Sequence, residues 1–248
     1  MTFKPDTLCP CDVREAVNHG DRNPDLNIDI LLLHYTGMIS GEDAEDWLCR
    51  EESGVSCHYL VHEDGRIVQM VPEALRAWHA GKSSWQDEPD TNSRSIGIEI
   101  VNPGHDNGYP DFPEVQIEAV VNLSLDIIGR RGIPARHVLA HSDVAPGRKQ
   151  DPGEKFPWRY LHERGVGHWA EAGAKQPSGF WQLGDNGEPV AALQAMLALY
   201  GYGIEITGNY NQKTMDCIKA FQLHFRQSNT DGIADGETIA ILDALIQS

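Results

Sequence analysis

Residues 140–153 run Ala-His-Ser-Asp-Val-Ala-Pro-Gly-Arg-Lys-Gln-Asp-Pro-Gly and follow directly on the short apolar run 137–140. Prolines and glycines interrupt the stretch, so it predicts a loop after a strand. A loop of this composition cannot build a core, yet it gathers a histidine, a lysine and a carboxylate in His141, Lys149 and Asp151. Such a cluster indicates a functional site.

The residue types in this loop suit a metal ion. His141 and Asp151 are both ligands that Zn²⁺ accepts. The best candidate for a third ligand is His34, which ends the apolar run 30–33. A lone histidine after a strand is usually a hydrogen-bonded side chain, but His34 pairs with a second strand-end loop, where sites of α/β sheets gather. Two histidines and one carboxylate leave a fourth position open, as in a catalytic zinc site.

Glu99 is a carboxylate in the middle of the apolar run 95–101. Strand alternation places Gly97, Glu99 and Val101 on one face. An unpaired carboxylate on a sheet face is costly, so Glu99 is either paired, for example with Arg94, or kept for function. Beside a metal it is a natural general base.

Lys149 and the loop from residue 76 offer further candidate groups. Lys149 is either a solvated loop lysine or, near Zn²⁺, a group that stabilises a developing oxyanion. Trp78 and His79 suit a groove for sugar or peptide, although both could equally be packing residues. His58 and His62 alternate along a predicted strand and are interpreted as structural.

The order of predicted elements sets the fold class. We expect strands over 28–33, 95–101 and 137–140, a hairpin from 55–61 and 66–71 around Asp64-Gly65, and helices over about 40–50 and 113–131. Residues 1–27 are expected to be an irregular arm, and a polar loop should reach from 76 to 94. Because strands and helices alternate, the class is α/β with a mixed central sheet flanked by helices.

The C-terminal part differs in composition. Apolar residues at helical spacing predict three short helices after residue 183, forming a small all-α unit. The predicted organisation is a catalytic domain over 1–165 that includes the arm 1–27, a linker over 166–182 and a three-helix domain over 183–248.

Charge and cysteine content limit the partners and the compartment. The net charge of −17 disfavours nucleic acid, whose phosphates would be repelled. The sequence contains no run of about 18 apolar residues, and so no transmembrane helix is predicted. Five scattered cysteines and no visible export signal favour free thiols in the cytoplasm, with the periplasm or cell envelope as the alternative.

The motifs resemble those of zinc N-acetylmuramoyl-L-alanine amidases of the AmpD/AmiD kind. The resemblance covers residues 28–162 and rests on five segments in the same order: Leu-His-Tyr-Thr at 33–36, Val-Ser-Cys-His-Tyr-Leu-Val at 55–61, Arg-Ala-Trp-His-Ala-Gly at 76–81, Ser-Ile-Gly-Ile-Glu-Ile at 95–100 and the loop that begins at His141. The C-terminal unit resembles a three-helix peptidoglycan-binding domain through Gly-Asp-Asn-Gly at 184–187, Gly-Tyr at 201–202 and Asp-Gly at 231–232.

The resemblance implies roles for individual residues. It implies that His34, His141 and Asp151 bind Zn²⁺. Glu99 would be the general base, and Lys149 would stabilise the tetrahedral intermediate. The groove for sugar and peptide would be lined by Tyr35, Trp78, His79 and Asn102. Cys57 departs from the small or aromatic residues common at its position, and we expect it to be inert.

The implied reaction is hydrolysis of the amide between N-acetylmuramic or anhydro-muramic acid and the L-alanine of the stem peptide, in wall recycling or remodelling. The implied partners are muropeptides and possibly polymeric peptidoglycan. The main alternative is a peptidoglycan recognition protein that binds without cutting, although such proteins commonly lose a zinc ligand. A peptidase is a distant third, because no His-Glu-x-x-His motif is present.

Overall fold

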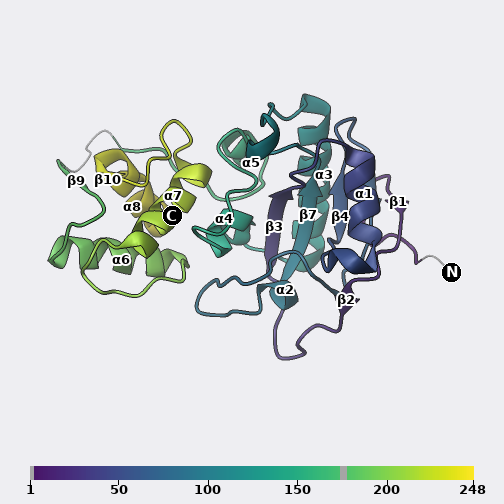
Figure 1. Cartoon of the computed structure of the whole chain (residues 1–248), viewed down its shortest axis with the longest axis horizontal. Coiled ribbons are helices and arrows are strands. Elements are labelled where there is room, and N and C mark those ends of the chain that lie inside the picture. The colour runs from purple at the N-terminus through teal and green to yellow at the C-terminus, as the bar shows by residue number, and fades with distance from the viewer. Residues whose placement is uncertain (1–2, 174–177) are drawn as a thin grey trace.

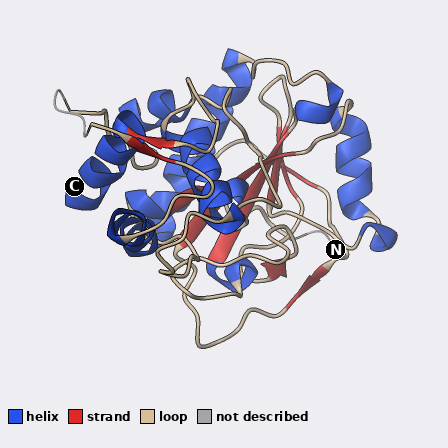
Figure 2. Cartoon of the chain, turned by 60° about the vertical axis from the view of Figure 1, so that its left-hand side comes forward, coloured by secondary structure: helices blue, strands red, loops and turns tan. Residues whose placement is uncertain are grey.

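The computed structural model describes residues 3–173 and 178–248. A larger unit built around a β-sheet lies beside a smaller helical unit formed by the C-terminal part of the chain (Figure 1). The two units differ in secondary structure, because the central sheet belongs to the larger one and the smaller one is mainly helical (Figure 2). The predicted α/β fold with a small helical C-terminal unit is confirmed.

Six strands form the central sheet in the order β1-β5-β4-β7-β3-β8. Their bounds in chain order are β1 Asp12–Val13, β3 Ile30–Tyr35, β4 Tyr59–Val61, β5 Ile67–Gln69, β7 Ser95–Ile100 and β8 Val138–Ala140. Only the β4–β5 hairpin is antiparallel, and the other neighbouring pairs are parallel. The sheet is therefore mixed, as the sequence predicts.

Three details of the predicted elements are wrong. The strand expected over 28–33 extends to Tyr35, so His34 lies within β3. The arm 1–27 is not wholly irregular, because β1 adds an edge strand and β2 (His19–Gly20) pairs with β6 (Arg76–Ala77). The loop that carries His141 begins with a helical turn, α4 (His141–Val144). Elements of two to four residues show no hydrophobic period, and so a sequence pattern cannot reveal them.

The two faces of the sheet have different partners. Leu31 and Leu33 of β3 pack with α3 (Glu114–Arg131), whereas Ile30 and Leu32 face the other way, toward the C-terminal unit. The two-residue period of a strand places His34 on this second face as well. The functional face of the sheet is thus the one opposite α3.

The remaining helices are short. Helix α1 (Gly41–Cys49) begins at Ser40, whose hydroxyl accepts a hydrogen bond from the Asp43 amide at 3.1 Å. The other elements of the larger unit are η1 Glu51–Ser53, α2 Thr91–Arg94, η2 His105–Asn107, η3 Ala135–His137 and α5 Trp158–Glu163.

The C-terminal unit contains the three predicted helices, α6 (Glu188–Tyr200), α7 (Gln212–Phe225) and α8 (Gly236–Gln247). Strand β9 (Phe180–Trp181) pairs with β10 (Ala234–Asp235), so this unit already begins within the predicted linker. Residues 174–177 of that linker lie outside the described residues.

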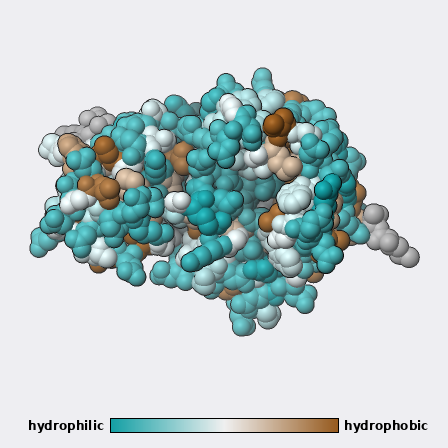
Figure 3. Space-filling view, viewed as in Figure 1, coloured by the Kyte–Doolittle hydropathy of each residue, from teal (hydrophilic) through white to brown (hydrophobic). Residues whose placement is uncertain are grey.

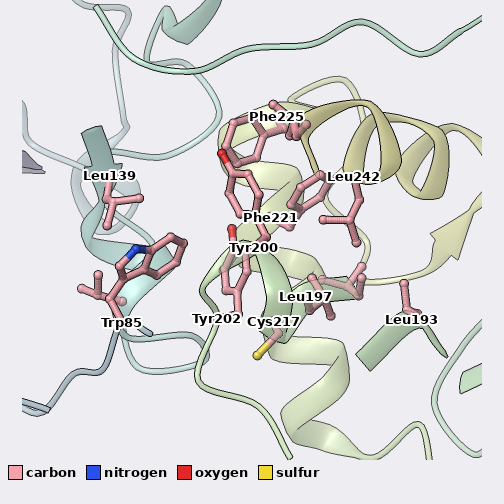
Figure 4. Packing of buried hydrophobic residues seen from close by; sticks show 14 of the residues in the cluster. Trp85, Leu139, Leu193, Leu197, Tyr200, Tyr202, Cys217, Phe221, Phe225 and Leu242 are labelled. Carbon is pink, nitrogen blue, oxygen red and sulfur yellow. The ribbon is translucent and has the colours of Figure 1, made fainter. Parts of the chain in front are cut away.

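The two units share one hydrophobic core. Trp85, from the loop before α2, is 1% exposed and packs edge-on against Tyr200 and Tyr202 of the C-terminal unit, at ring-centroid distances of 6.1 and 5.3 Å (Figure 4). Leu139 of β8 belongs to the same cluster. The small unit is therefore docked on the larger one through buried aromatic packing.

A buried carboxylate adds a polar contact to this interface. Asp143 of α4 accepts hydrogen bonds from the Tyr202 hydroxyl at 2.6 Å, from His224 Nδ1 at 2.7 Å and from the Ala140 amide at 2.8 Å. Asp143 lies two residues after His141, so the C-terminal unit holds the helical turn that carries this histidine.

Candidate metal centre and active site

Sheet register brings the first two candidate groups together. His34 of β3 lies directly beside Glu99 of β7 in the parallel pairing. Ala140, the last residue of β8, extends the same sheet edge, and His141 follows it immediately. Asp151 returns to this edge because its carbonyl accepts a hydrogen bond from the Ser142 amide at 3.1 Å. Residues more than 100 positions apart thus meet at the carboxyl ends of parallel strands.

His34, His141 and Asp151 form a buried triangle of potential ligand atoms. Nδ1 of His34 lies 2.9 Å from Nδ1 of His141, and the two nitrogens lie 3.3 and 3.0 Å from Oδ2 of Asp151. A tetrahedral zinc site with bonds near 2.1 Å separates its ligand atoms by about 3.4 Å. The donor types and their spacing therefore fit one small cation.

The second nitrogen of each histidine also has a partner. His141 Nε2 lies 3.0 Å from the carbonyl oxygen of Ala80, and His34 Nε2 lies 3.0 Å from Nδ1 of His79. Such outer contacts fix the ring orientation of metal-binding histidines. His79 comes this close because Gly97 has no side chain, since a Cβ there would lie 2.5 Å from the imidazole ring.

The pKa values in the cluster are consistent with this arrangement. Burial lowers the pKa of His34 to about 4 and that of His79 well below its usual value, so both rings are neutral. His79 Nδ1 can therefore accept a hydrogen bond from the N–H at His34 Nε2. Although burial opposes it, the neighbouring His141 and His34 lower the pKa of Asp151, which is therefore ionised. Neutral imidazoles and a carboxylate are the forms that bind a metal.

Glu99 lies beside the triangle without a structural partner. Its Oε2 atom is buried and has no hydrogen-bond partner among residues 3–173 and 178–248. Arg94, the alternative partner considered from the sequence, pairs instead with Asp29 at 2.7 Å. Burial and the Asp151 carboxylate raise the pKa of Glu99 well above its usual value. A carboxyl group in this setting is suited to taking and giving a proton.

A groove of about 420 Å³ opens over these residues. It is called the zinc groove below, and its walls include Tyr35, His79, Glu99, His141, Lys149 and Asp151. Its walls also include Trp47 of α1 and Val55, which are each 39% exposed. The molecular surface on the side shown in Figure 3 is mostly hydrophilic, with separate apolar patches. No described helix is long and apolar enough to span a bilayer.

Comparison with known proteins identifies the family. Residues 24–154 match the model of the N-acetylmuramoyl-L-alanine amidase family, and residues 186–242 match that of a peptidoglycan binding domain. The chain belongs to the N-acetylmuramoyl-L-alanine amidase family.

Relatives that align with most of the chain support this assignment. N-acetylmuramoyl-L-alanine amidase AmiD of Escherichia coli is 39% identical over 238 residues, which covers 89% of this chain and 83% of that protein. The structure of AmiD with anhydro-N-acetylmuramic acid-L-Ala-D-γ-Glu-L-Lys superposes with a TM-score of 0.76 at 35% identity, covering 94% of this chain and 92% of that one. Pseudomonas aeruginosa AmpDh3 gives a TM-score of 0.73 at 30% identity, covering 100% and 98%.

The zinc groove is lined by only some of the side chains expected to bind substrate. Tyr35 lines it, and its hydroxyl lies 2.9 Å from Nδ1 of His105. His79 also lines it but is 8% exposed and faces His34. Trp78 is absent from the lining residues, and its indole nitrogen lies near Gly20.

Asn102 has a different place from the one expected. It is 2% exposed, its side-chain nitrogen donates to the Pro110 carbonyl at 3.0 Å, and its side-chain oxygen accepts from the Gly104 amide at 2.9 Å. Both ends of the amide are therefore used to shape the loop after β7, and we assign it no contact with substrate.

Three further residues have the structural or inert roles that the sequence predicts. His58 is buried, and its Nδ1 accepts a hydrogen bond from the Gly97 amide at 3.0 Å. Nε2 of His62 lies 2.9 Å from Oε2 of Glu45. Cys57 is fully buried, and burial raises the pKa of its thiol well above the usual value, which keeps it unreactive.

The sequence did not point to His105, which lies next to Tyr35, or to Glu154, and neither residue lines the zinc groove. His105 joins Tyr35 to Glu154, whose Oε2 lies 2.9 Å from Nε2 of the imidazole. His105 begins η2, an element of three residues that is too short to show a periodic pattern in the sequence. The one signal that could have found it is the mixture of a histidine, an acid and an aromatic ring in His105, Asp106 and Tyr109.

Proposed function

We propose that this chain is a zinc-dependent amidase that hydrolyses the amide between the lactyl group of N-acetylmuramic acid and L-alanine of the peptidoglycan stem peptide. The observation that carries the proposal is the buried His34–His141–Asp151 triangle with the unpaired carboxyl of Glu99 beside it, in one open groove. Family membership supports amide hydrolysis as the reaction.

The three ligand residues suit zinc better than the common alternatives. Mg²⁺ and Ca²⁺ prefer sites made only of oxygen ligands, whereas two imidazoles and one carboxylate suit Zn²⁺. A bound zinc ion supplies a Lewis acid that polarises the scissile carbonyl and lowers the pKa of water.

The remaining steps are assigned to residues of this chain. Glu99 takes a proton from the attacking water and passes it to the nitrogen of the leaving L-alanine. Lys149 has no ion-pair partner within the described ranges and lines the same groove, so its ammonium group is free to stabilise negative charge that develops on the carbonyl oxygen. His79 holds the ring of His34, and the Tyr35 hydroxyl is placed to contact substrate.

Muropeptides are the proposed substrates. The AmiD complex carries a sugar linked to a tripeptide, and this chain aligns with that structure over nearly its whole length. A soluble anhydro-muropeptide is the first candidate substrate for the zinc groove. Polymeric peptidoglycan is the second candidate substrate, because residues 186–242 match a peptidoglycan binding domain.

The cytoplasm stays the proposed compartment. All five cysteines are free thiols in the structure, which suits a reducing environment. An envelope location is the alternative, and it goes with polymeric peptidoglycan as the substrate.

A product assay in ¹⁸O-labelled water tests the reaction. Zinc-loaded protein is incubated with an anhydro-muropeptide and, separately, with intact sacculi. The proposal predicts free stem peptide and one ¹⁸O atom in the lactyl carboxylate. Cleavage of a peptide bond would show a peptidase instead. Retained binding without any cleavage would leave a recognition protein.

A further inference from the structure

A second groove begins where the zinc groove ends. It has a volume of about 390 Å³ and lies between the loop that carries Asp151 and helix α7 of the C-terminal unit. We call it the α7 groove, and its charged and polar walls are His105, Arg148, Lys149, Glu154, Asp216 and Lys219.

The two grooves are continuous. Arg148, Lys149 and Gln150 line both of them. Helix α7 approaches this loop closely at Gly147, which has a φ of 78°, and a Cβ there would lie 2.4 Å from Oδ2 of Asp216. A ligand held at the zinc groove can therefore extend along the loop and reach α7 without leaving the surface.

The α7 groove contains several positive charges that have no ion-pair partner among the described residues. Arg148, Lys149 and Lys219 form no ion pair with a carboxylate in the described part of the chain, and they face two acids, Glu154 and Asp216. Three cations against two acids is unusual in a chain with a net charge of −17. The groove is thus suited to a ligand that carries carboxylates together with an amino group.

The wall of the zinc groove toward α1, on the side away from the C-terminal unit (Figure 1), has the other character. Met38, Trp47, Leu48 and Val55 line it. An exposed aromatic ring beside apolar side chains suits the face of a neutral sugar ring. The proposed substrate has the same asymmetry about its scissile amide: a neutral sugar on one side and a charged peptide on the other.

We infer that the α7 groove is the subsite for the stem peptide beyond L-alanine, and that Lys219 of the C-terminal unit binds a peptide carboxylate there. Asp216 and Glu154, the latter paired with His105, line the same groove and would face the amino group of the third residue. The inference rests on the proposed function and gives the C-terminal unit a part in recognising the peptide of each substrate molecule.

The test compares two substrates and two lysine variants. The substrates are anhydro-N-acetylmuramic acid carrying L-Ala-D-γ-Glu-L-Lys and the same sugar carrying L-Ala alone. Lys219→Ala should lower the ratio of kcat/KM for the long substrate to that for the short one by roughly fivefold, mainly through KM. Lys213→Ala removes the same charge from α7 at a position outside both grooves and should leave the ratio unchanged.

The dissociation constants of both compounds, measured by calorimetry, separate this inference from the proposed reaction. A protein that binds both compounds without cutting them would overturn the amidase proposal, while a Lys219-dependent ratio of dissociation constants would still support the subsite. An equal ratio in wild type, Lys219→Ala and Lys213→Ala would overturn the subsite even if both substrates are cleaved.

Discussion

At the scale of single residues, the role of a histidine depends on what its second nitrogen contacts. His34 and His141 point one nitrogen each toward Asp151, and His79 occupies the other nitrogen of His34. The ligand triangle could be predicted because its donor types follow strand ends, where parallel sheets gather their sites. The positions of His79 and Asn102 could not, because hydrogen bonds in irregular loops leave no pattern in a sequence.

The contact between His79 and His34 gives the first prediction. His79→Ala removes the acceptor for His34 Nε2 and should raise the zinc dissociation constant by about tenfold. Competition with a chromophoric chelator measures this constant. His79→Gln keeps an acceptor and should recover part of the loss, and Trp78→Phe, next to it in sequence but outside the groove, should match wild type. Equal zinc affinity in His79→Ala and Trp78→Phe would contradict the assigned role.

At the scale of elements, the alternation of side chains along strands predicted which face of the sheet carries Glu99. The two-residue period of β7 placed Glu99 on the face opposite the isoleucines, and register with β3 then set it beside His34. The pairing itself required the structure, because two strands separated by about 60 residues reveal their register only when they meet. Strands β1 and β2 escaped prediction because each has two residues.

A buried ion cluster ties the turn after β5 to the end of α3. Glu73 is fully buried and pairs with Arg130 at 2.7 Å and Arg131 at 2.6 Å, and the Tyr59 hydroxyl donates to it at 2.7 Å. Burial alone would raise the pKa of Glu73, but these hydrogen bonds outweigh it and lower the pKa to about 2. The ionised form is therefore favoured by the folded state.

This cluster predicts a loss of stability in acid. Because the pKa of Glu73 is lower in the folded than in the unfolded chain, its stabilisation is complete above about pH 4.5 and is lost as the pH falls toward 2. Its contribution is on the order of 3 kcal/mol. The difference in unfolding free energy between wild type and Glu73→Gln should shrink over this range, whereas exposed Glu63→Gln should follow wild type. A difference that does not change with pH would refute the coupling.

At the scale of the whole molecule, the two units form one folded body. Trp85 from one unit is buried against Tyr200 and Tyr202 from the other. The sequence predicted three helices after residue 183 but not their docking. The reason is that a buried tyrosine shows the same helical spacing whether it packs within its own unit or against a neighbour.

Shared packing predicts a single unfolding transition. Calorimetry of the intact chain should show one cooperative peak, and Trp85→Ala should lower the unfolding free energy by about 3–5 kcal/mol and weaken the coupling between units. Trp47→Ala removes an indole that is 39% exposed and should cost far less. Two separate transitions in the wild type would show that the interface contributes little.

Glu99 is the proposed general base beside a zinc ion that His34, His141 and Asp151 would hold. The most direct test measures bound zinc and the rate of muropeptide cleavage in the same preparations of wild type, Glu99→Gln and the exposed control Glu63→Gln. We expect one zinc per chain in all three, with cleavage lowered at least about 100-fold only in Glu99→Gln. Cleavage at the wild-type rate by zinc-loaded Glu99→Gln would contradict this role.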